Sequence, residues 1–145
     1  MAQGLDFDEI DAQVRAYLAT TRLAFSLESL ENLARNGRVN PAVAKLVGVL
    51  GIRIVGRASD EGTLQQLHKC RGEKKALTAI FDEMKERGYC GGKVWIDHCL
   101  NLKAAMALKE IICNQFPDSD VRIGTCTGLC SYYAEQGGLL VGYEG

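Results

Sequence analysis

The sequence has no long apolar run and no excess of charge of either sign. None of its hydrophobic segments approaches the roughly 20 residues that a membrane-spanning helix needs, so we expect no membrane insertion. There are 17 Lys and Arg residues against 18 Asp and Glu residues, a formal net charge of −1, which argues against a basic footprint for nucleic acid. The N-terminus lacks the basic-then-apolar pattern of a signal peptide. These absences predict a cytoplasmic protein with no nucleic-acid partner.

Familiar cofactor motifs are also missing. The 16 glycines form neither the Walker A loop nor the dinucleotide fingerprint, so no nucleotide cofactor is expected. Cys126 and Cys130 have a spacing that suits zinc, and His98 and Cys99 could complete the site. Structural zinc, however, normally uses two such pairs of ligands, and only one pair is present. A zinc- or thiol-based enzyme is therefore the remotest alternative. We expect the six cysteines to be reduced and mostly structural, with no metal and no catalytic residue.

What is present is enough apolar sequence for one domain core. The chain has 145 residues, of which 47% are hydrophobic. From residue 52 onward the predicted order is strand, strand, helix, strand, helix, strand, helix, strand. Single helices that alternate with strands cover a sheet, and a hairpin over residues 52–70 makes that sheet mixed. We predict an α/β two-layer sandwich, a mixed β-sheet covered by helices, with residues 1–145 as a single domain.

The segment before the hairpin is predicted to be mainly helical. Apolar residues at steps of three and four predict a helix over residues 6–20, and a short strand follows at 22–25. Ser26 is a good N-cap for a second helix that ends at Asn36-Gly37, and Asn40-Pro41 begins a third. After the hairpin, helices are predicted over 73–87, 101–115 and 129–136, and strands over 93–98, 120–124 and 138–143.

Two polar stretches are candidates for ligand contacts. Lys69, Arg71, Lys74 and Lys75 lie where a strand gives way to a helix, so Arg71 could hold a carboxylate or phosphate beside the helix N-terminus. A solvated run of charges is the alternative. Gly124-Thr-Cys-Thr-Gly128 follows the end of a strand, and strand ends in α/β folds often line ligand crevices. A plain polar loop is the alternative there.

Several segments of the sequence resemble, in their order along the chain and in their spacing, segments of the C-terminal half of DegV proteins. Each is weakly specific alone, but together they cover nearly the whole chain. Where many members carry Gly-Thr-His-Thr-Gly before the last strand, this chain has Gly124-Thr-Cys-Thr-Gly128, so Cys126 takes the place of a histidine. The other matching segments are Leu27-Glu-Ser-Leu30, Asn36-Gly-Arg38, Gly51-Ile-Arg-Ile-Val55, Glu61-Gly62, Lys69-Cys-Arg-Gly-Glu-Lys-Lys-Ala76 and Val94-Trp-Ile-Asp-His98.

The resemblance implies a bacterial fatty-acid-binding protein. Such proteins hold a long-chain fatty acid between two domains, and some present it to a fatty acid kinase that performs the chemistry. The implied ligand contacts are Arg71, Arg38, Thr125 and Cys126. A structural role is the alternative for Arg38, and a thiol at residue 126 is a weaker donor than the histidine that it replaces.

The resemblance also predicts that a partner domain is missing. The sequence begins near the expected border between the two domains, so we expect the N-terminal DegV domain to be absent. An apolar face left by that domain would favour a homodimer, because large exposed apolar patches rarely persist in monomers. The alternative function is a regulatory or protein-interaction module of the same fold that does not bind fatty acid.

Overall fold

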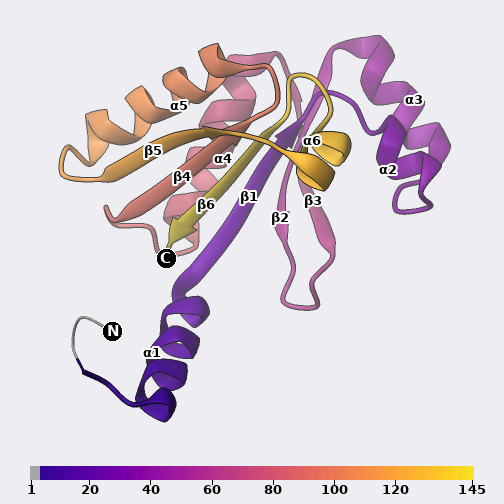
Figure 1. The fold of residues 1–145 in the computed structure, drawn as a ribbon. Coiled ribbons are helices and arrows are strands. Elements are labelled where there is room, and N and C mark those ends of the chain that lie inside the picture. The colour runs from indigo at the N-terminus through magenta and orange to yellow at the C-terminus, as the bar shows by residue number, and fades with distance from the viewer. Residues whose placement is uncertain (1–3) are drawn as a thin grey trace.

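A six-stranded mixed sheet forms the centre of the molecule (Figure 1). The computed structural model describes residues 4–145, apart from the side chains of Leu46, Val49 and Leu50. The strand order is β3-β2-β1-β6-β4-β5, and neighbours are antiparallel except for β4 and β5. The predicted mixed α/β sheet is confirmed. The strands are β1 (Thr21–Leu27), β2 (Ile52–Ala58), β3 (Leu64–Arg71), β4 (Lys93–His98), β5 (Asp120–Thr125) and β6 (Leu139–Glu144).

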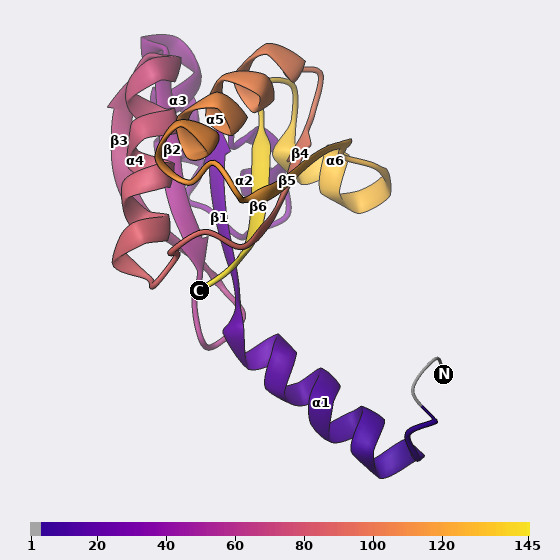
Figure 2. The same cartoon turned by 90° about the vertical axis from the view of Figure 1, so that its left-hand side faces the viewer.

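Helices lie on both faces of this sheet. In Figure 2, α4 and α5 are on one side of the strands and α6 is on the other. The second face is covered only in part, by α6 together with α2 and α3, whose side chains pack against β1 and β2. The helices are α1 (Phe7–Thr20), α2 (Glu31–Arg35), α3 (Pro41–Leu50), α4 (Glu73–Glu86), α5 (Leu102–Gln115) and α6 (Gly128–Ala134).

Strand alternation divides the core into two clusters. Successive side chains of a strand point to opposite faces, so β6 sends Val141 toward α4 and α5 and Leu140 to the other face. The first cluster contains the fully buried Ile80 of α4 and Leu108 of α5. The second cluster lies under α2, α3 and α6 and includes Phe25. The sheet therefore has one closed face and one that is only partly covered.

The structure corrects the sequence prediction at Ser26. This residue does not cap a helix; it belongs to β1, is 1% exposed, and pairs with Val55 on one side and Leu139 on the other. Helix α2 begins only at Glu31, after Leu30, which makes no side-chain capping bond. The capping preference of serine is worth about 1 kcal/mol, and two neighbouring strands outweigh it. As a result β1 is longer than the predicted strand at 22–25.

Helix α1 confirms the prediction for residues 6–20 and projects from the rest of the molecule (Figures 1 and 2). Asp6 and Glu9 form a capping box that starts the helix. Its apolar stripe, however, is not part of the core: the exposed fractions are 80% for Phe7, 50% for Val14 and 59% for Leu18. This stripe stands free of the core of the described chain.

Candidate functional site

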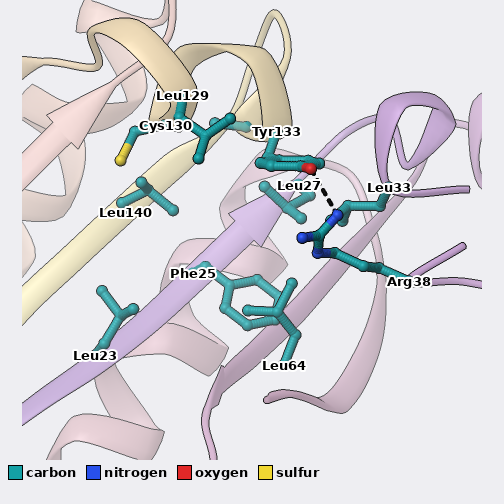
Figure 3. Close-up of a pocket in the computed structure, with 11 residues that line it drawn as sticks. Leu23, Phe25, Leu27, Leu33, Arg38, Leu64, Leu129, Cys130, Tyr133 and Leu140 are labelled. Atoms are coloured by element: carbon teal, nitrogen blue, oxygen red, sulfur yellow. Dashed lines mark hydrogen bonds between the residues drawn. The ribbon is translucent and has the colours of Figure 1, made fainter. Parts of the chain in front are cut away.

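An apolar pocket of about 260 Å³ lies on the partly covered face of the sheet (Figure 3). Its floor is made by Leu23, Phe25 and Leu27, which alternate along β1 and share that face. Leu140 from β6 and Leu64 from β3 continue the floor on either side. Leu64 is 48% exposed, so the pocket opens to solvent along this side. Such a surface suits an apolar group and offers it no hydrogen bond.

The pocket is roofed by the two short helices α2 and α6. Helix α2 contributes Leu33, which is 2% exposed, and α6 contributes Leu129, Tyr133 and Ala134. In Figure 3, Leu129 and Tyr133 lie across the pocket from Phe25. Leu129 itself is 69% exposed. The roof thus has a fixed inner part at Leu33 and an open margin at Leu129.

Polar contacts hold the two roof helices together. The carboxylate of Glu135, just after α6, accepts hydrogen bonds from the Asn32 backbone N–H at 2.8 Å and the Ser29 hydroxyl at 2.5 Å. It therefore caps the N-terminus of α2 from a distant part of the chain. The Asn32 side-chain amide donates to the Tyr132 carbonyl oxygen at 2.8 Å. These contacts fix the position of Leu33 relative to Tyr133.

Arg38 brings a positive charge to the rim of the pocket. It is the only charged side chain among the described residues that line the pocket. One guanidinium nitrogen donates to the Tyr133 hydroxyl at 2.6 Å, and the guanidinium carbon lies 4.8 Å from the centre of the Tyr133 ring. Within the described chain, no carboxylate forms an ion pair with Arg38. Its charge is therefore available to an anionic group of a ligand.

Cys126, predicted as a ligand contact, lies beside the pocket and does not line it. Its side chain is 7% exposed and packs in the same apolar cluster as Leu27 and Leu33. Burial, with a smaller contribution from the nearby Asp97, raises the pKa of the thiol to about 11. At neutral pH the Cys126 side chain is therefore uncharged.

Thr125 and Arg71 occupy opposite edges of the sheet. Thr125 is exposed at the end of β5, and Arg71 is exposed at the end of β3. Five strand spacings of roughly 4.8 Å separate these strands, a span of about 24 Å, so the two side chains cannot hold one carboxylate together. Of the four predicted contacts, only Arg38 lines the pocket. Contacts of the other three with a ligand stay predictions.

Sequence reasoning missed most of the lining. Residues of the floor could have been found from their alternation at 23, 25 and 27, once residues 21–27 are taken as a strand. Tyr133 had no comparable signal, because its role depends on α6 folding back over β1. Among the described residues, no group of three or more His, Cys, Asp or Glu side chains is placed to hold a metal ion, and no helix is long and apolar enough to cross a membrane.

Fold and pocket together define a mixed-sheet α/β domain that can surround an apolar group beside one cation. A sequence model described as that of the DegV family of uncharacterised proteins matches residues 1–144. The chain belongs to the DegV family. It is 48% identical over 141 residues to a DegV domain-containing protein of Streptococcus pyogenes serotype M3, and 45% identical over 142 residues to one of Streptococcus pneumoniae strain R6.

These alignments cover 97% and 98% of this chain but 50% of each relative. The chain thus spans about half the length of the curated relatives that it matches. Among solved structures it is similar to the S. pneumoniae Fatty Acid Kinase (Fak) B3 protein loaded with linoleic acid, with a TM-score of 0.93 and 45% identity over 98% of this chain and 50% of that one. It is also similar to a DegV family protein of Eubacterium eligens loaded with heptadecanoic acid, with a TM-score of 0.92 and 44% identity over 99% of this chain and 52% of that one.

Proposed function

We propose that this chain is one half of a fatty-acid-binding protein and holds part of the acyl chain in the apolar pocket. The observation that carries the proposal is the pocket itself, whose described lining is mainly apolar and includes one charged side chain, that of Arg38 at the rim. A fatty acid has the matching chemistry, an apolar chain that ends in one carboxylate. Two similar solved proteins, at 45% and 44% identity, are described as loaded with fatty acids.

The size of the pocket supports a shared site. Pockets that enclose a drug-sized ligand measure roughly 300–1,000 Å³, and this pocket measures about 260 Å³ and opens to solvent. It can enclose only part of a long acyl chain. A second domain, comparable in size to the remaining half of the relatives, would cover the rest of the chain.

The partly covered face offers a place for that second domain. The apolar stripe of α1 is exposed, and so is Trp95 on β4, at 49%. Trp95 lies on the same face of the sheet as Leu140, since both alternate with residues that face α4 and α5. A domain packed on this face would cover the α1 stripe, Trp95 and the open side of the pocket together.

The proposed role is to bind and present the fatty acid, with a fatty acid kinase as the partner that performs the chemistry. One similar protein carries the name Fatty Acid Kinase (Fak) B3 protein and is described as loaded with linoleic acid. Burial keeps the Cys126 thiol protonated, and a protonated thiol is a poor nucleophile. This argues against a reaction at Cys126, the residue that takes the place of the family's histidine.

Native mass spectrometry of the purified chain, titrated with oleic acid and followed by organic extraction, tests the proposal. We expect an adduct of fatty-acid mass that extraction recovers. In Leu64→Asp, a carboxylate at the pocket margin should repel the ligand and abolish the adduct. Leu102→Asp, at a similarly exposed leucine on α5, should leave the adduct unchanged. No adduct at saturating oleic acid, or equal loss in both variants, would overturn the proposal.

The second candidate is a protein-interaction module of the same fold. The observation that favours it is the exposed stripe of Phe7, Val14 and Leu18 on α1, which suits a protein surface whether or not the pocket binds lipid. A bare mass in the titration, combined with stable association through α1, would support this candidate over lipid binding.

A further inference from the structure

The floor of the pocket depends on a cross-strand contact between Phe25 and Gly56. Phe25 on β1 is paired directly with Gly56 on β2, so both point to the pocket face. A Cβ atom placed on Gly56 would lie 2.5 Å from Cζ of Phe25 and would also meet the backbone oxygen of Gln65. The Phe25 ring therefore occupies the space above Gly56 that any other residue would fill.

The backbone fixes this pairing in place. The β1–β2 register, which is uninterrupted, places Gly56 directly opposite Phe25. The bulge in the β2–β3 pair lies on the β3 side, because Val55 and Gly56 pair with His68 and Gln66. With Gly56 bare, the ring lies over β2, and Figure 3 shows it on the floor beside Leu64. A side chain at residue 56 would drive the ring upward into the volume that Leu33 and Tyr133 roof.

We infer that the Phe25–Gly56 contact determines the length of acyl chain that the pocket accepts. This inference rests on the proposed function. The Phe25 ring is a large apolar group in the floor, so its bulk and height limit the space left for ligand carbon atoms. A shorter side chain at residue 25 deepens the pocket, and a side chain at residue 56 makes it shallower.

A homologous series of saturated fatty acids, measured by displacement of a fluorescent fatty acid from the 145-residue chain, tests the inference. In Phe25→Leu the preferred chain should become longer, with about a fourfold gain in affinity for each additional methylene that is buried. In Gly56→Ala the preference should move to shorter chains. The double variant Gly56→Ala/Phe25→Leu should return toward the original profile, because the leucine side chain no longer needs the space above residue 56.

Phe81→Leu is the matched control. Phe81 is as buried as Phe25, at 5% against 3% exposed, but it lies on α4 at the other face of the sheet. The Phe81→Leu substitution makes the same chemical change and causes a comparable loss of packing without touching the pocket. The chain-length profile of this variant should therefore stay that of the unsubstituted chain. Phe25→Leu keeps the test decisive if the backbone contact at Gln65 prevents Gly56→Ala from folding.

The outcomes separate this inference from the proposed function. An unsubstituted chain that displaces no probe with any fatty acid would overturn both. A chain that binds fatty acids, but whose length preference is the same in Phe25→Leu, would overturn the chain-length inference alone. A shift in Phe81→Leu equal to that in Phe25→Leu would also overturn it, because the effect would then come from general loss of packing.

Discussion

Arg38 places one positive charge at the rim of a pocket that is otherwise mainly apolar. Its guanidinium is held by the hydroxyl and the ring of Tyr133, neither of which neutralises its charge. The neighbouring Arg35, by contrast, pairs with Glu31 at 3.5 Å within α2. A carboxylate that enters at the rim therefore meets a cation that is oriented but unpaired within the described chain.

Replacing Arg38 should weaken fatty-acid binding. A hydrogen bond to a charged group contributes roughly 1.5–3 kcal/mol, and for Arg38→Ala we expect the lower end, about a tenfold loss of affinity, because Arg38 is exposed. Displacement titration with oleic acid measures the loss, and Arg35→Ala is the control. The methyl ester of oleic acid should bind both variants equally. A tenfold loss in Arg71→Ala, with none in Arg38→Ala, would place the carboxylate at Arg71 instead.

Two buried groups should make the free energy of unfolding depend on pH in the alkaline range. Burial raises the pKa of Cys126 from about 9 to about 11 and that of Tyr143 from about 10 to about 12. The folded chain thus holds these protons more tightly than the unfolded chain. The contribution is fully present below pH 9, and unfolding becomes easier as the pH rises from about 9 to about 12.

Urea unfolding at several pH values checks this expectation. The free energy of unfolding should fall between about pH 9 and about pH 11. Tyr143→Phe and Cys126→Ala should each make the fall shallower, because each removes one group that ionises on unfolding. A free energy that rises over this range, or a slope that neither substitution alters, would contradict the assignment.

At the scale of elements, the roof of the pocket depends on one residue with an unusual backbone. Glu135 has φ 52° and ψ 176°, a region that is populated almost only by glycine and costs of order 1–3 kcal/mol. Its carboxylate caps α2 through the Asn32 backbone N–H. The strain in the backbone is thus offset by a contact that joins α6 to α2.

Substitutions at residue 135 should separate these two effects. Glu135→Ala keeps the strain and removes the cap, so we expect a loss of about 2 kcal/mol in the free energy of unfolding. Glu135→Gly also loses the cap but relieves a backbone strain of about 1–3 kcal/mol. The greater freedom of glycine in the unfolded chain offsets about 0.4–1 kcal/mol of that relief, so Glu135→Gly should cost less than Glu135→Ala. Chemical denaturation measures both, with Gln136→Ala as an exposed neighbour for comparison. Equal losses in the alanine and glycine variants would show that the backbone strain is not significant.

At the scale of the whole molecule, the uneven covering of the sheet decides how the chain behaves alone. One face is closed by α4 and α5, whereas the pocket, Trp95 and the α1 stripe are exposed. Large exposed apolar patches rarely persist in a monomer. A second domain would cover it in a longer protein; alone, two copies can cover each other.

We therefore expect the 145-residue chain to form a homodimer through the α1 stripe. Size-exclusion chromatography with light scattering should give twice the chain mass, and Leu18→Glu should give a monomer because it places a charge in the stripe. Gln13→Glu adds the same carboxylate beside the stripe and should remain dimeric. A monomeric unsubstituted chain, or a dimer that survives Leu18→Glu, would rule out this interface.

Local chemistry was sufficient to predict most elements of the fold. Asn40 and Asn101 cap α3 and α5 as expected, since a cap needs only neighbouring residues. The β2–β3 hairpin and the alternation of strands and helices likewise follow from short stretches of sequence. These features predicted a mixed α/β sheet, and the motifs predicted the family.

Only the tertiary structure decided where β1 lies and what it brings together. Placing β1 between β2 and β6 converts Ser26 from an expected cap into a buried strand residue, and puts Leu23, Phe25 and Leu27 on the pocket floor. The same strand order sends Arg71 and Thr125 to opposite edges. Strand order is set by contacts between residues far apart in the chain, which no local pattern encodes. The sequence alone therefore determined most of the elements, whereas the pocket depends on how they are arranged in three dimensions.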